Sequence, residues 1–80
     1  MNRVAFRLVE LADRFGEPTQ EGIRITLPFT QEELAGWIGA SREAVVKALR
    51  VLRSRGYIET QRKTVVVTDL AGLRRRAGAG

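Results

Sequence analysis

The amino-terminal residues carry an apolar residue at intervals of three and four positions. This spacing places the apolar side chains on one face of a helix, so it predicts an amphipathic helix over residues 3–15. Gly16 follows directly and favours the end of the helix. The apolar positions of this predicted helix are Val4, Leu8, Leu11 and Phe15. One apolar stripe needs a partner, so the rest of the chain must supply a surface that covers it.

Polar residues then occupy positions 17–22, which we expect to form a connection. Apolar and polar residues alternate over residues 23–27, as in a short strand with one buried face. Pro28 lacks a backbone N–H group and therefore ends this strand.

Two helices are predicted next. Thr30 and Glu33 fit a capping box, in which the side chain of each residue accepts a hydrogen bond from the backbone amide of the other. The inward positions of the short helix that follows are Leu34, Ala35 and Ile38. Gly39 ends this helix, and Ser41 is a favourable N-cap for a second helix over residues 42–55.

The helix over residues 42–55 has two contrasting faces, and Gly56 ends it. Its apolar, inward positions are Val45, Ala48, Leu49 and Leu52. Its outward positions are Arg42, Glu43, Val46, Lys47, Arg50 and Arg53.

The last third of the chain begins with β-prone residues. Segments 57–60 and 64–68 flank a polar turn at residues 61–63, a pattern that predicts a β-hairpin with core valines at positions 65–67. Asp69 can cap a last short helix, whose apolar positions are Leu70 and Leu73. The basic, glycine-containing end that follows is expected to fray.

Charge is distributed unevenly. The 80 residues carry a net charge of +5, and ten of the 14 lysines and arginines lie in the second half. A one-sided positive field suits a polyanion, although basic helices can also be merely solvated surfaces.

The chain has no Cys and no His, which excludes disulfides, metal sites built from these residues, Cys nucleophiles and His general bases. No apolar run could span a membrane and no signal-peptide pattern follows Met1, so we expect a single cytoplasmic domain over residues 1–80.

Two helices joined by a glycine-containing turn and followed by a hairpin form a winged helix-turn-helix, an α+β fold. The second helix of such a fold enters the major groove of DNA with its amino-terminal residues leading. Arg42 can pair with guanine O6 and N7, Glu43 can accept from the cytosine amino group, and Lys47 lies one turn deeper on the same side. Alternatively, Arg42 and Glu43 are ordinary surface residues, and Glu43 simply favours the positive end of the helix dipole.

The stretch "LPFTQEELAGWIGASREAVVKALRVLRSRGYIE", followed by "KTVVVTD", resembles the DNA-binding domain of the cyclic-AMP receptor and fumarate-nitrate regulator (Crp/Fnr) family of bacterial transcription regulators. The similarity covers roughly residues 3–73, and its most specific parts are "TQEELA", "SREAV" and "RGYIE". It implies sequence-specific binding to double-stranded DNA at a palindromic operator. Arg42, Glu43 and Lys47 would read a G·C-containing half-site.

The same resemblance implies contacts to the phosphates beside the groove. The residues in this role would be Thr30, Ser41, Arg50, Gln61, Arg62 and Lys63. Relatives often have glycine at the position of Arg62, so a tight two-residue turn is in doubt in this chain.

The resemblance also suggests what lies outside these residues. Family members carry an amino-terminal effector domain and a dimerisation helix, and neither is present in this chain. We therefore expect no cofactor here, because a cyclic nucleotide or other effector would bind the absent domain. The isolated domain is expected to be a monomer or weak dimer, and a full-length regulator a homodimer. Relatives contact RNA polymerase through the loop that corresponds to Glu17–Gly22, although this loop could also be an ordinary connector.

Other functions have less support in the residues. The main alternative is a winged-helix module that holds a protein partner and has only nonspecific affinity for nucleic acid. An enzyme is not expected, because Ser41 has no His partner and this small chain cannot easily build a pocket for a Ser41–Lys47 pair. A membrane-surface role is also not expected, because helix 42–55 uses its apolar face for the core. Trp37 is expected to pack rather than stack on a base, and residues 74–76 are either a solvated end or a further DNA contact.

Overall fold

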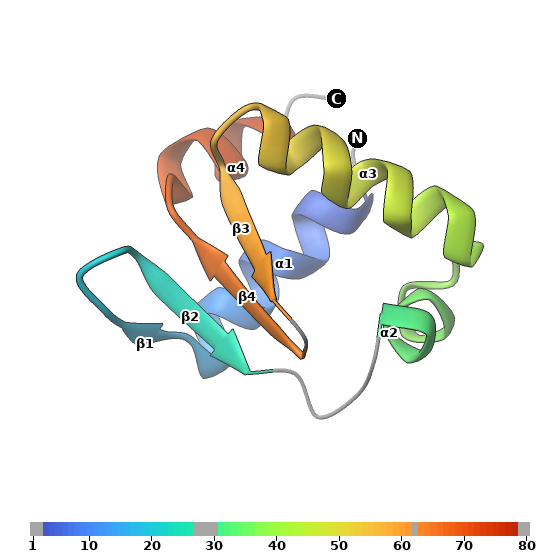
Figure 1. Ribbon diagram of the computed structural model, residues 1–80, viewed down its shortest axis with the longest axis horizontal. Helices are drawn as coiled ribbons and strands as arrows, with labels where there is room; N and C mark the ends of the chain where they lie inside the picture. The colour runs from blue at the N-terminus through green and yellow to red at the C-terminus, as the bar shows by residue number, and fades with distance from the viewer. Residues whose placement is uncertain (1–2, 27–30, 62, 79–80) are drawn as a thin grey trace.

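The computed structural model describes residues 3–26, 31–61 and 63–78, and within these ranges it contains an α+β winged helix-turn-helix, as predicted (Figure 1). The helices are α1 (Arg3–Phe15), α2 (Gln31–Ile38), α3 (Arg42–Ser54) and α4 (Leu70–Gly78). The strands are β1 (Glu17–Pro18), β2 (Ile23–Thr26), β3 (Ile58–Gln61) and β4 (Thr64–Val67).

The strands form an antiparallel sheet in the order β1-β2-β4-β3. Ile25 of β2 pairs with Val65 of β4. This pairing joins β2, from the first half of the chain, to the carboxyl-terminal hairpin. Strand β1 was not predicted, because a two-residue strand containing proline has no alternating pattern. It forms where Glu17 pairs with Arg24, whose guanidinium lies 3.3 Å from the Glu17 carboxylate.

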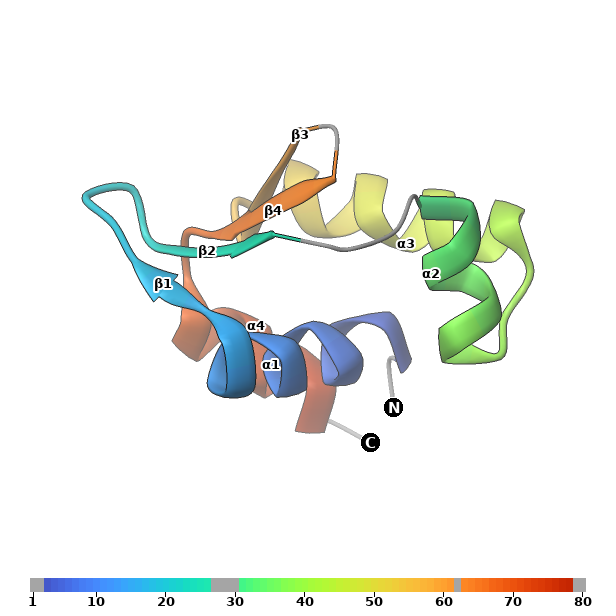
Figure 2. The same cartoon turned by 90° about the horizontal axis from the view of Figure 1, so that it is seen from below.

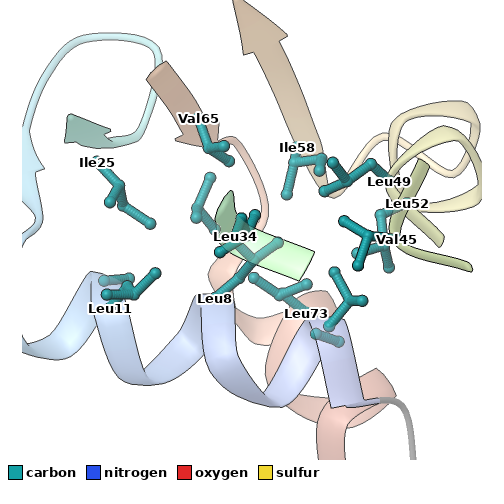
Figure 3. Close-up of a cluster of buried hydrophobic side chains, with 14 of the residues drawn as sticks. Leu8, Leu11, Ile25, Leu34, Val45, Leu49, Leu52, Ile58, Val65 and Leu73 are labelled. Atoms are coloured by element: carbon teal, nitrogen blue, oxygen red, sulfur yellow. The ribbon is translucent and has the colours of Figure 1, made fainter. Parts of the chain in front are cut away.

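The helices lie toward opposite sides of the sheet (Figure 2). Helices α1 and α4 lie together on one side of the sheet, whereas α3 and the tip of the β3–β4 hairpin lie toward the other. Side chains from all four helices and from three of the strands meet between them in one apolar core (Figure 3). The largest fully buried side chains are Leu8, Ile25, Leu34, Leu52, Ile58, Leu73, Val45 and Val67.

The predicted inward faces are largely confirmed. Leu34, Ala35 and Ile38 are buried, as are three of the four inward positions of α3, and Ala48 packs against the core while partly buried. The three valines of β4 do not all belong to the core, because side chains alternate along a strand: Val65 and Val67 are buried and Val66 is half-buried.

The prediction for Phe15 was wrong. This side chain is 63% exposed, because the residue lies at the very end of α1, beyond the stripe that packs inward. Ala5 and Ala12 are buried instead.

The carboxyl-terminal residues do not fray as expected over residues 74–78, because α4 extends to Gly78. The Asp69 carboxylate caps the helix by accepting from the Gly72 amide at 2.9 Å, as predicted. Leu73 and Ala77 are four residues apart and both buried, so this helix has an apolar stripe that packs on α1. The Arg74 guanidinium also lies 2.7 Å from the Asp13 carboxylate of α1.

Trp37 packs, but outside the core. Its side chain is 45% exposed, and the Arg7 guanidinium of α1 lies 5.1 Å from the centroid of its ring. A cation of α1 therefore packs on the face of this aromatic ring.

Candidate nucleic-acid interface

The turn between α2 and α3 sets the direction of α3. Gly39 has a φ of +80°, a conformation that glycine adopts without steric cost. The Ala40 amide donates to the Ala35 carbonyl at 3.0 Å and the Gly39 amide to the Gly36 carbonyl at 3.3 Å, the pair of bonds that defines a Schellman motif. Helix α2 thus ends at a fixed point, and α3 starts after three intervening residues at a new angle.

Ser41 begins α3 as its N-cap, as predicted. Its backbone is extended and its hydroxyl oxygen accepts from the Ala44 amide at 3.1 Å. The hydroxyl hydrogen can still be donated to an external acceptor such as a phosphate oxygen. The remaining amides of the first turn point outward from the positive end of the helix dipole, which favours anions.

Burial of one face of α3 fixes what the other face presents. Because Val45, Leu49 and Leu52 are buried, the charged residues of this helix point away from the core. They surround an open hollow of about 500 Å³ on the outer surface. The residues that line it are Arg42, Glu43, Val46, Lys47 and Arg50. The structure therefore brings together all three predicted base-reading residues and one predicted phosphate contact.

Several charges on this surface have no partner within the domain. Across residues 3–26, 31–61 and 63–78, the side chains of Glu43, Lys47, Arg50 and Lys63 make no hydrogen bond or ion pair. By contrast, Arg7, Arg24 and Arg74 form ion pairs with Glu10, Glu17 and Asp13 outside this surface. Their positive charge is thereby offset locally, whereas that of Lys47, Arg50 and Lys63 is available to an external anion.

The wing ends in a two-residue turn. Gln61 pairs with Thr64 in the hairpin register, which leaves only positions 62 and 63 between the strands. The prediction about the residue type at position 62 lies outside the described residues. Lys63 is exposed and has a φ of +57°, while Gln61 is exposed at the end of β3. The two remaining candidates, Thr30 and Arg62, lie outside the described residues, as does the capping box with Glu33.

Sequence reasoning missed a contact between α3 and the wing. The Arg53 guanidinium donates to the Thr60 hydroxyl at 2.7 Å. Arg53 continues the row of cations at positions 47 and 50, so the sequence presents it as one more surface charge. Only the packing of β3 against the end of α3 brings a hydroxyl within its reach.

None of the helices within residues 3–26, 31–61 and 63–78 is long and apolar enough to span a membrane. The described residues also contain no group of three or more acidic, His or Cys side chains arranged to hold a metal ion.

A family model for the Crp-like helix-turn-helix domain matches residues 2–76 of this chain. The chain belongs to this family. It is 51% identical over 77 residues to the CRP-like cAMP-activated global transcriptional regulator of Mycobacterium tuberculosis, covering 94% of this chain and 34% of that protein. It is 36% identical over 76 residues to the transcriptional regulator SdrP of Thermus thermophilus, covering 95% of this chain and 37% of that one.

Solved structures agree with this family assignment. The Crp-like domain superposes on the CO-dependent transcription factor CooA of Carboxydothermus hydrogenoformans with a TM-score of 0.89 at 28% identity, over 95% of this chain and 36% of CooA. A CRP-family transcriptional regulator of Thermus thermophilus gives a TM-score of 0.81 at 37% identity, over 98% of this chain and 40% of that one. The chain thus spans little more than a third of the length of the relatives it matches.

Proposed function

We propose that this chain is the DNA-reading domain of a Crp-type transcription regulator, with α3 inserted in the major groove. The observation that carries the proposal is the outer face of α3, where Glu43, Lys47 and Arg50 have no partner within the described residues and lie around one hollow. A helix whose amino-terminal half presents both cations and a carboxylate suits base edges, which offer both acceptors and donors.

The base-reading roles follow from position on α3. Arg42 and Glu43 lie in the first turn, where a recognition helix approaches the bases most closely. Arg42 would donate to guanine O6 and N7, and Glu43 would accept from the cytosine amino group. Lys47 lies one turn further along the same face and would read a third position. These roles predict a half-site that contains G·C pairs.

The phosphate contacts would flank the groove on two sides. Ser41 and the first amides of α3 would bind one strand, with Arg50 further along the helix. Gln61 and Lys63 would bind from the wing, which projects on the same side of the domain as α3 (Figure 2). Thr30 and Arg62 remain candidates on the basis of the sequence alone.

The partners of a complete regulator are also proposals. One matched relative is named for activation by cAMP and another for dependence on CO, and the greater part of each lies outside the matched region. We propose that any effector binds such a further region, that two regulators pair on a palindromic operator in the cytoplasm, and that this chain itself has no cofactor and no enzymatic role.

A contact with RNA polymerase is proposed for the Glu17–Gly22 segment. This segment forms an ordered turn, because the Thr19 hydroxyl donates to the Gly22 carbonyl at 2.8 Å and accepts from the Gly22 amide at 3.2 Å. Gln20 and Glu21 are exposed at its tip. A rigid, polar and exposed turn suits a protein contact, in contrast to a flexible connector.

The test is selection of bound sequences from a random duplex library at moderate salt. The 80-residue chain is compared with its Arg42→Ala and Glu43→Ala variants. We expect enrichment of a short G·C-containing motif, with altered preference in each variant. Binding that follows salt alone and enriches no motif would refute sequence-specific readout and favour the alternative, a module that holds a protein partner.

A further inference from the structure

The wing is joined to the end of α3 at its base. Gly56, with a φ of +77°, follows the C-cap residue Arg55 of α3, and its carbonyl accepts from the Thr68 hydroxyl at 2.8 Å. The Tyr57 carbonyl accepts from the amides of Thr68 and Asp69 at 2.9 and 3.1 Å. Both strands of the hairpin are therefore fixed where they meet the helix.

The Arg53–Thr60 hydrogen bond forms a second connection closer to the tip. Thr60 is two residues beyond the buried Ile58, so their side chains share the face of β3 that is directed toward the body of the domain. Arg53 lies in the last turn of α3 and donates to Thr60, and both residues line a surface hollow of about 470 Å³.

This connection restrains the part of the wing that the sheet restrains least. Strand β2 pairs with β4 along its whole length, from Ile23–Val67 to Thr26–Thr64, whereas β3 is the outer strand of the sheet and pairs with β4 alone. Beyond these residues lies the turn with Lys63. A charged group must be held to within about half an ångström to make an oriented contact, so a restraint one residue before the end of β3 affects where the turn meets a phosphate.

We propose that Arg53 is a positioning residue, which holds the wing at a fixed distance from the recognition helix through Thr60 rather than binding DNA itself. The proposal rests on the proposed function, because it assigns the wing a phosphate contact. Arg53 differs in this respect from Lys47 and Arg50, whose side chains bind no group within the described ranges.

The test separates the hydroxyl from the charge. Thr60→Val removes the acceptor, keeps the β-branched shape and leaves the Arg53 charge in place. Arg53→Gln removes the charge, and Arg53→Lys keeps a charged donor. The DNA affinity of each variant is measured alone and in combination with Lys63→Gly. Fluorescence anisotropy gives this affinity for two duplexes, the one selected with the unaltered chain and a scrambled one. Each titration is repeated over a range of salt concentrations.

We expect Thr60→Val and Arg53→Gln each to weaken binding by about two- to tenfold, the range that corresponds to one net hydrogen bond. The loss caused by Lys63→Gly should shrink in either background, because an unrestrained wing has less of this contact to lose. Arg53→Lys should retain part of the affinity. If Arg53→Gln weakens binding and lowers the salt slope while Thr60→Val leaves both unchanged, Arg53 is a phosphate ligand and the proposal is wrong.

A measurement without DNA keeps this test independent of the proposed function. Residual dipolar couplings of the β3 amides, referred to those of α3, should change in Thr60→Val and Arg53→Gln. If the unaltered chain selects no duplex, the proposed function fails. The dipolar couplings then still test whether the Arg53–Thr60 hydrogen bond restrains the wing. Unchanged couplings in both variants would overturn the restraint itself.

Discussion

Lys63 shows how one residue can combine a conformational cost with a functional role. Its φ of +57° lies in the left-handed region, where a residue with a side chain is less stable than glycine. A turn chosen for stability alone would have glycine at this position. The retention of a cation at the tip of the wing agrees with a phosphate contact.

The substitution Lys63→Gly should therefore weaken DNA binding without lowering the stability of the fold. We expect the free energy of unfolding to stay the same or increase slightly, because glycine adopts this φ without strain. Affinity for DNA should fall on every sequence tested, and the slope of log K against log salt should decrease by about 0.9, the value for one phosphate contact. Titrations on the selected and a scrambled duplex at several salt concentrations measure both.

The matched control for this variant is Arg14→Ala, which removes one cation from the exposed end of α1. Its salt slope should equal that of the unaltered chain. If the two variants behave alike, Lys63 contributes only to the net charge.

The helix-turn-helix depends on a glycine whose role is conformational rather than steric. A Cβ atom at Gly39 would meet nothing within 4 Å, so the positive φ alone disfavours other residues there. Gly36, three residues earlier, is exposed within α2 and also has open space around it. The two glycines thus offer the same substitution in opposite backbone conformations.

Gly39→Ala should lower the free energy of unfolding by about 1 kcal/mol, since alanine must adopt a left-handed conformation. Gly36→Ala should raise it by up to about 1 kcal/mol, because alanine is the better helix former. Urea denaturation of both variants measures the difference. A stabilising Gly39→Ala would show that the turn does not require the left-handed conformation.

Helix α4 makes the carboxyl-terminal residues part of the fold. Ala77→Asp should destabilise the domain by about 2–4 kcal/mol, because it places a charge at a buried position of α4, the helix that packs on α1. Arg75→Asp introduces the same carboxylate on the exposed side of the same helix, and it should cost less than about 1 kcal/mol. Thermal unfolding compares them, and equal, small effects would indicate a frayed end.

At the scale of the whole molecule, α1 and α4 lie on one side of the sheet and α3 lies toward the other (Figure 2). Asp13 pairs with Arg74 between α1 and α4. Lys47, Arg50 and Lys63, whose side chains have no partner within the described residues, belong to α3 and the wing. A single domain of this kind offers one reading helix, so high affinity requires a second copy on the same DNA.

Two copies joined by a flexible linker should therefore bind a palindromic operator at least about 100-fold more tightly than the single chain does. Half-sites one helical turn apart are separated by about 34 Å, which a glycine-serine linker of about 40 residues spans on average. The gain should disappear on a duplex with one half-site. An equal gain on both duplexes would mean that the linked copies bind by charge alone.

The sequence by itself determined the elements that have a repeated pattern or a dedicated end residue. Apolar spacing placed α1, α2, α3 and the hairpin, while Ser41, Gly39, Gly56 and Asp69 marked where helices begin and end. These signals are local, because each depends on residues within a few positions of one another. The grouping of Arg42, Glu43 and Lys47 was predictable for the same reason, since all three lie within two turns of one helix.

Only the tertiary structure decided which cations bind partners within the domain. Arg74 and Asp13 are far apart in sequence and meet because α4 packs on α1, and Arg53 meets Thr60 because β3 packs beside the end of α3. Trp37 is covered by Arg7 for a similar reason. Such contacts depend on the distances between elements, which no local pattern specifies. The availability of Lys47, Arg50 and Lys63 to an external anion is therefore a property of the fold, although the presence of these cations is a property of the sequence.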